Sequence, residues 1–357
     1  MIYDISRVPT LDMTGSDPEH FAPVSIALPC LTLNLGASRA FGSDAIMRLS
    51  RPAQEAIMNA EVHSHQRFDI YRTVTDSIVA SIEAGAGEFI MPWHGHGAPI
   101  AKPQNAHTHM EYHGINVLAL WAQAHERGYR SGYWGTYRQW QEVGAQVVKG
   151  EKSSIIVFFK RIEEEAEQAG ERPFNRLFAR ASRVFNADQV AGWAAPEERH
   201  PPGNAEVIES VATFIKATKA DVQWGGRMAC YHIVDDYIEM PDAHRFRNTP
   251  TSTASEGLGA TILHELVHWT GAKHRLERFS GSLKKEDIAA EELVAELGAA
   301  FLCADLGVSN EPRPDHAAYV AHWLQLLKND TRAIFTASRL ANQAAMFLHE
   351  LASAGEW

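Results

Sequence analysis

The chain has 357 residues, of which 45% are hydrophobic and 22% are charged, as in a globular protein of two or three domains. Its formal net charge of −11 argues against nucleic-acid binding through bulk positive charge, so any such binding needs a local basic and aromatic surface. The three cysteines, Cys30, Cys230 and Cys303, lie far apart and form no CxxC pair. This spacing excludes a thiolate zinc ribbon and argues against a disulfide framework.

The N-terminal segment, residues 1–64, shows no sustained hydrophobic period, and we leave it as an unassigned extension. Its first residues include acids and prolines where a secretory signal has a basic start and an apolar run. No stretch of the chain is long and apolar enough to span a membrane. We therefore expect a cytoplasmic protein without a membrane partner.

A compact α+β unit is predicted over residues 65–165. Apolar residues recur every four positions from 70 to 82, which indicates an amphipathic helix. A second helix is predicted to end at Gly128, and Thr136 is a candidate N-cap for a third. The segment 146–161 has two β-rich runs around a Lys-Gly-Glu-Lys turn, which predicts a hairpin.

An acidic, helix-prone segment follows, and we predict a connector over residues 166–184. A second domain is expected at 185–357, beginning with a helix after a Pro-rich loop. The sequence CYHIVDDYIEMP then predicts two short strands that end at Pro241. Beyond Ser255 the pattern is helical almost to the end of the chain, with helices predicted at 256–270, 288–305, 315–329 and 331–352.

The segment TILHELVHWTG carries a candidate metal site. His264 and His268 are four residues apart, so on a helix both imidazoles project from one face and can share one metal ion. Glu265 lies between them, where its carboxylate can accept a proton from a water molecule that zinc makes acidic. This is the HExxH pattern of zinc peptidases, with Glu265 as the catalytic base.

A catalytic zinc site needs a third protein ligand, and the sequence offers two candidates. The first is His274, because residues 264–274 match HExxHxxGxxH, the metzincin arrangement. Metzincins also have a methionine turn downstream. The only methionine after His274 is Met346, which lies in an apolar helical run.

The second candidate lies in the segment EELVAELGAAF, on another predicted helix. There Glu292 would ligate the metal, and Glu296, four residues later, would accept a hydrogen bond from a ligand histidine and fix its tautomer. We favour Glu292, because a two-helix site explains both acids on an otherwise apolar face. Glu291 is interpreted as part of the solvated helix face.

Six blocks in order resemble one family. They are YHGINVLALW, WGTYRQWQEVGAQVVKGEK, VFNADQVAG, DYIEMP, HELVHWTGAKHRL and EELVAELGAAFL. The chain from about Arg67 to near its C-terminus resembles the antirestriction proteins of the ArdC type, which are carried by plasmids and phages. It is also similar to the N-terminal part of some plasmid primases. Family members more often have a histidine at position 272 and a small polar residue at position 274, whereas this chain has Ala272 and His274.

The resemblance implies a single-stranded-DNA-binding N-terminal domain, a zincin-like metallopeptidase domain with Zn²⁺, and protection of incoming DNA from host restriction. Single strands are bound by aromatic platforms and basic groups, and residues 93–160 supply both. From this region we select Trp134, Arg138, Lys149 and Lys152 as DNA-binding residues. The histidines of this region, at positions 94, 96, 107, 109 and 113, are interpreted as exposed loop residues.

The predicted class is therefore α+β, with a small α+β DNA-binding domain followed by a mainly helical zincin-like metallopeptidase domain. The favoured function is a zinc-dependent peptidase of unknown protein substrate joined to a single-strand binder. One alternative is a non-enzymatic protein that coats single-stranded DNA and has a structural metal site. Another is a plain cytoplasmic metallopeptidase with the ligands His264, His268 and His274.

Overall fold

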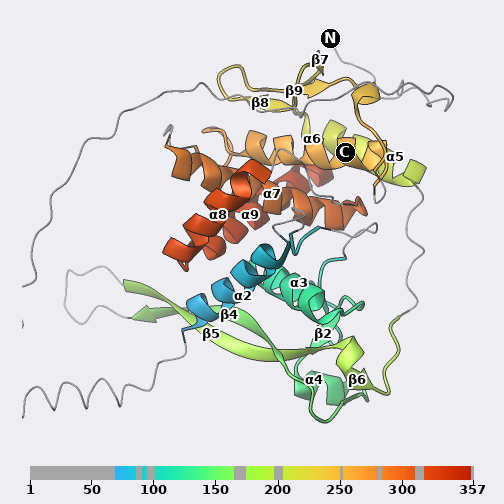
Figure 1. Ribbon diagram of the computed structural model, residues 1–357, viewed down its shortest axis with the longest axis vertical. Helices are drawn as coiled ribbons and strands as arrows, with labels where there is room; N and C mark the ends of the chain where they lie inside the picture. The colour runs from blue at the N-terminus through green and yellow to red at the C-terminus, as the bar shows by residue number, and fades with distance from the viewer. Residues whose placement is uncertain are drawn as a thin grey trace, which may run out of the picture. The chain divides into compact units, whose positions relative to one another are not determined.

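A computed structural model of the chain describes residues 69–85, 91–94, 101–164, 174–196, 204–249, 252–279, 284–309 and 317–354 (Figure 1). The extension predicted at 1–64 lies outside these residues. From Ile70 onward the described elements belong to one compact unit. Helices and strands are both well represented, so the predicted α+β class is confirmed.

In its described residues, the N-terminal part combines a four-stranded and a two-stranded sheet with three α-helices. Its α2 and α3 pack against each other, and α3 also packs on the long strand β4 (Figure 1). The predicted period explains α2, because Val74, Ile78 and Ile82 are all buried on its inner face. The elements are α2 (Ile70–Gly85), β1 (Gln104–Asn105), α3 (Ile115–Arg127), β2 (Tyr133–Gly135), α4 (Tyr137–Glu142), β3 (Gln146–Val147), β4 (Ser154–Glu164), β5 (Phe174–Asn186) and β6 (Val190–Ala191).

Both predicted helix ends in this part are confirmed. Gly128 ends α3 with a φ of 69°, a left-handed conformation that glycine adopts without a steric penalty. Thr136 is the N-cap of α4, where its side chain accepts a hydrogen bond from the backbone N–H of Gln139. Gln139 in turn accepts a hydrogen bond from the Thr136 backbone and completes a capping box.

The hairpin predicted at 146–161 is wrong. Its first run, β3, pairs with β6, whereas its second run, β4, pairs with β5 along eleven registered positions from Ser154↔Val184 to Glu164↔Phe174. The four-stranded sheet has the order β1-β2-β5-β4. The predicted connector 166–184 therefore overlaps a strand of this sheet, because the acidic segment joins two strands of one sheet rather than two domains.

The C-terminal part places a small sheet beside a set of packed helices. The sheet has the order β7-β9-β8, with β7 parallel and β8 antiparallel to β9. The two strands predicted in CYHIVDDYIEMP are confirmed, and β7 was not predicted. The elements are α5 (Asn204–Thr218), β7 (Val222–Gly226), β8 (Cys230–His232), β9 (Tyr237–Pro241), α6 (Ala254–Thr270), α7 (Lys285–Leu306), α8 (Ala317–Asn329) and α9 (Ala333–Ala354).

Helix α6 is buried along most of its length and packs on α7, which also packs on α8 and α9 (Figure 1). It begins at a capping box in which Thr253 and Glu256 exchange hydrogen bonds. The helices predicted beyond Ser255 are confirmed to within a few residues at each end. Among the described residues, no helix has the length and apolar character needed to cross a bilayer.

One glycine allows α6 and α7 to approach closely. A Cβ atom at Gly298 on α7 would lie 2.8 Å from a methyl carbon of Val267 on α6, closer than side chains tolerate. Val267 is fully buried and one residue from His268, while Gly298 is two residues from Glu296. The small residue therefore sets the separation of the two helices that carry the predicted metal ligands.

Candidate metal centre and nucleic-acid surface

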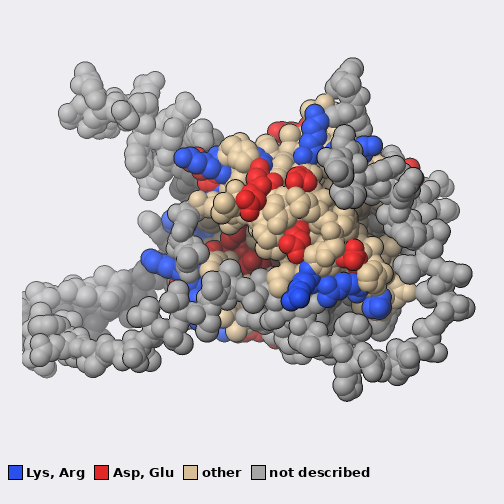
Figure 2. Space-filling view, turned by 90° about the horizontal axis from the view of Figure 1, so that it is seen from above, with Lys and Arg blue, Asp and Glu red and all other residues tan. Residues whose placement is uncertain are grey.

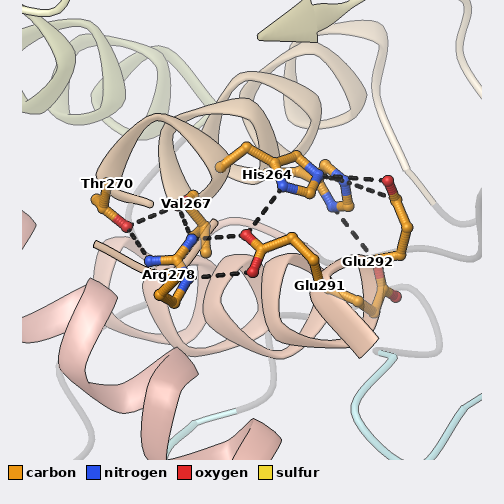
Figure 3. Close-up of polar contacts among 8 residues, drawn as sticks. His264, Val267, Thr270, Arg278, Glu291 and Glu292 are labelled. Carbon is orange, nitrogen blue, oxygen red and sulfur yellow. Dashed lines mark hydrogen bonds and ion pairs between the residues drawn. The ribbon is translucent and has the colours of Figure 1, made fainter. Parts of the chain in front are cut away.

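Three predicted ligands meet between α6 and α7. The Nε2 atoms of His264 and His268 are 3.2 Å apart, and each lies 3.6 Å from a carboxylate oxygen of Glu292. His264 is buried, and the side chains of His268 and Glu292 are largely buried. Figure 3 shows Glu292 reaching from α7 toward the histidine face of α6. Among the described residues, these three form the group of side chains that has the spacing of a metal site.

The geometry of this group fits a divalent metal. Ligand atoms around a tetrahedral zinc ion lie about 3.3 Å apart when the bonds are about 2.0–2.1 Å long. The distances of 3.2 Å and 3.6 Å bracket this value. In the part of the chain that is described, the Oε2 atom of Glu292 is buried and accepts no hydrogen bond. A buried carboxylate oxygen in that state is costly unless a cation or donor satisfies it.

In the metal-free site, burial and charge pairing shift the pKa values of His268 and Glu292 in opposite directions. Burial lowers the pKa of His268, but the carboxylates of Glu292 and Glu291 outweigh it and raise that pKa to about 10. Burial raises the pKa of Glu292, but the positive charge of His268 and the contact with His264 hold it well below its usual value. A proton on His268 thus balances the carboxylates in the absence of metal.

Metal affinity should therefore rise with pH. His268 is protonated below about pH 10, and a histidine ligand must be neutral, so binding releases one proton from it. We expect the apparent zinc affinity to rise about tenfold per pH unit between about pH 6 and 8. Competition with a chromophoric chelator at several pH values measures this slope. In a Glu291→Gln variant the pKa of His268 falls, so the rise of zinc affinity with pH should level off at a lower pH than in the wild type. An affinity that is independent of pH would contradict a protonated His268.

Glu291 is not on a solvated face, so that interpretation is wrong. Its carboxylate accepts hydrogen bonds from Arg278 at 2.7 Å and 3.2 Å and lies 3.3 Å from Nδ1 of His268. Arg278 also donates to the Thr270 hydroxyl and to the Val267 carbonyl, both at 2.6 Å (Figure 3). Two adjacent acids at the ligand position were the only sign of this network in the sequence. The network holds the ring of His268 from the side opposite the ligand group.

Glu296 lies beside His264, as the two-helix interpretation requires. Its Oε2 atom is 3.9 Å from Nδ1 of His264, within the range of an ion pair and beyond that of a hydrogen bond. Its Oε1 atom is 2.9 Å from Nε2 of His94, which is 3% exposed. The interpretation of His94 as an exposed loop residue is therefore wrong. Position 96 lies outside the described residues.

The other candidate ligand, His274, lies elsewhere. Helix α6 ends at Thr270, and the turn that follows leaves the His274 side chain 63% exposed and 3.2 Å from Asp236. Glu265, by contrast, is buried in α6. Burial, together with the negative charges of Glu265, Glu239 and Glu292, raises the pKa of the Cys230 thiol to about 11.

The four predicted DNA-binding residues differ in exposure. Trp134 was selected as an aromatic platform for DNA, but it lies in β2, is 1% exposed and packs edge-on against Tyr129, so this prediction is wrong. Arg138 is exposed and paired with Glu142, and Lys149 and Lys152 are exposed. The strand β2 lies inside the sheet and buries the ring of Trp134 in the core, so this ring cannot stack on a base.

A basic corner forms where β4 begins, and we define it as Arg127, Lys152 and Arg183. Arg127 donates to the Lys152 carbonyl at 2.6 Å, and Arg183 donates to the Ser153 hydroxyl at 3.2 Å. Further along this ladder Phe158 is 54% exposed and pairs with the exposed Arg180. The face with the β7-β9-β8 sheet instead shows acidic side chains near its centre, among scattered basic ones (Figure 2).

Comparison with protein families agrees with this division of the chain. Residues 68–185 match the family described as the N-terminal domain of anti-restriction factor ArdC. Residues 209–340 match the family described as zincin-like metallopeptidase. The first match ends at β5, where the sheet of the N-terminal part is complete, and the second contains α6 and α7.

Two relatives each cover more than three quarters of the chain. The protein y4eC of Sinorhizobium fredii is 44% identical over 288 residues, which span 79% of this chain and 92% of that protein. The DNA primase TraC of Escherichia coli is 32% identical over 300 residues, 78% of this chain and 27% of the primase.

Two solved structures share the fold. The metal-free crystal structure of the antirestriction protein ArdC from plasmid R388 is 42% identical, with a TM-score of 0.67, and covers 80% of this chain and 99% of its own. The Mn(II)-bound structure of that protein is 40% identical, with a TM-score of 0.65 and the same coverage. The chain thus matches an ArdC N-terminal domain and a zincin-like domain, and it resembles a solved ArdC protein over nearly the whole of that protein. We conclude that the chain belongs to the ArdC family of antirestriction proteins.

Proposed function

We propose that this protein binds single-stranded DNA through its N-terminal part and carries a zinc-dependent peptidase site in its C-terminal part. The observation that supports the peptidase is the arrangement on α6 and α7. His264, His268 and Glu292 form a ligand triangle, and Glu265, the residue that follows His264 on α6, is buried. A structural site has no use for that carboxylate, whereas hydrolysis needs a base there.

The residues of the chain divide the work in this proposal. Bound zinc supplies a Lewis acid and lowers the pKa of water. Glu265 accepts the proton from the attacking water and returns it to the leaving amine. Glu291 holds the ring of His268 through its contact with Nδ1, and Glu296 lies beside Nδ1 of His264. The strand β8 is the outer strand of its sheet and packs against α6, so an extended peptide can pair with its edge beside the site.

The purified protein tests this function directly. We expect about one zinc equivalent per chain, removable by a chelator. Incubation with a mixture of denatured proteins, read by mass spectrometry, should reveal new termini that disappear after chelation and return with zinc. A protein that holds zinc and yields no new termini in any mixture would contradict the peptidase and leave the metal a structural role.

The DNA-binding proposal rests on the exposed basic residues near β4. The double variant Lys149→Glu, Lys152→Glu should bind single strands more weakly, with a salt slope smaller by about 1.4, because each phosphate contact contributes about 0.7. Phe158→Ala should weaken binding by about 1–3 kcal/mol if its ring stacks on a base. Titration of a fluorescent oligonucleotide at several salt concentrations measures both effects.

The matched control changes the same charge elsewhere. Lys216→Glu, Lys285→Glu alters two exposed lysines of the C-terminal part, on α5 and α7, and so lowers the net charge equally. It should leave the slope unchanged. If both double variants lower the slope alike, the effect is one of net charge, and the binding surface is not at β4.

A further inference from the structure

A short segment of the N-terminal part reaches the metal centre. Met91, Trp93 and His94 are all buried. His94 contacts Glu296, which lies about 200 positions later in the chain. The Nδ1 atom of His94 accepts a hydrogen bond from the Met91 backbone N–H at 3.0 Å. A neutral imidazole that accepts at Nδ1 carries its hydrogen on Nε2. His94 therefore donates from Nε2.

The acceptor of this hydrogen bond is Glu296. Its Oε1 atom lies 2.9 Å from Nε2 of His94 and accepts a second hydrogen bond from Nε1 of Trp93 at 3.2 Å. Two donors on one oxygen fix the plane of the carboxylate, and the other oxygen, Oε2, then faces Nδ1 of His264 at 3.9 Å. A carboxylate in that place keeps the hydrogen of His264 on Nδ1 and leaves Nε2 for a metal.

We propose that His94 and Trp93 are positioning residues of the metal centre: by holding Glu296, they set the tautomer and orientation of His264, so that metal affinity in the C-terminal part depends on the N-terminal part. The inference rests on the metal site proposed above. It assigns a role to the segment from Met91 to His94, whose sequence has no metal-ligand pattern. The metal centre then depends on residues from both parts of the chain.

The contact would be only structural if His94 and Trp93 filled space and nothing more. The two roles differ in their chemistry, because space filling needs a ring of the right size, whereas positioning needs an N–H donor. His94→Phe keeps a ring and removes the donor, and Trp93→Phe does the same at the neighbouring residue. His94→Gln replaces the ring but offers an amide N–H near the original Nε2 position.

The experiment measures zinc affinity of the full chain by competition with a chromophoric chelator. We expect His94→Phe to weaken zinc binding by about 10–100-fold and His94→Gln to recover most of that loss. Trp93→Phe should give a smaller loss, because His94 still holds the carboxylate. In the Co²⁺-loaded protein, His94→Phe should also shift the visible absorption bands, since these report the orientation of the ligands.

A matched control is His107→Phe, which removes another histidine near a carboxylate, Glu142, in the same part of the chain. It should bind zinc as the wild type does. Wild-type affinity and an unshifted Co²⁺ spectrum in His94→Phe would overturn the inference while the metal site stands. Equal losses in His94→Phe and His94→Gln would also overturn it, because the donor would not matter. A wild-type protein that binds no zinc would overturn both proposals.

Discussion

The variant Glu265→Gln is expected to keep its metal and to lose protection of incoming unmodified DNA. Glutamine has nearly the size of glutamate, so the buried position on α6 is filled, but its amide cannot accept a proton. Removal of a general base lowers the rate of a hydrolytic step by about 10²–10⁴-fold. The measurement compares the transfer of an unmodified plasmid into a restricting host that produces the wild type or the variant.

The control for this variant is Glu286→Gln, at an exposed position in the first turn of α7. It should protect as the wild type does. Metal content is measured on all three proteins, so that loss of protection is not confused with loss of the ion. If Glu265→Gln holds metal and protects fully, the protein acts by coating DNA, and its metal is structural.

The variant Glu292→Ala is expected to lose most of its metal affinity, whereas His274→Ala should keep it. Structural zinc sites bind with about 10–16 kcal/mol, so each of three ligands accounts for about 3–5 kcal/mol, or at least about two orders of magnitude in affinity. Glu292 lies 3.6 Å from both histidines, while His274 is exposed beside Asp236. Metal analysis after gel filtration and chelator competition give the two affinities.

The double variant His264→Ala, His268→Ala defines the lower limit of this measurement and should hold no metal. Circular dichroism of each variant checks that α6 and α7 remain folded. If His274→Ala loses the metal and Glu292→Ala retains it, the ligand set is that of a metzincin, and the geometry between α6 and α7 does not hold the ion.

Local signals located the helices and most of the predicted strands, but they did not show which strands pair. Apolar periodicity and caps such as Thr136 and Gly128 depend on residues that are close together in the chain, so they can be recognised from the sequence. Pairing of β4 with β5 depends on residues beyond an acidic segment that resembles a connector. A strand's partner is not encoded within the strand, and for this reason the predicted hairpin was wrong and the predicted connector overlaps β5.

The sequence alone determined the family resemblance, the helical spacing of His264 and His268, and the acid between them, because a helix converts a spacing of four into one face. Only the tertiary structure decided which third group joins them. That choice depends on the close approach of α6 and α7, which Gly298 permits, and on the turn that carries His274 away. Burial likewise removed Trp134 from the surface, because exposure depends on what packs against a ring and not on its neighbours in the chain.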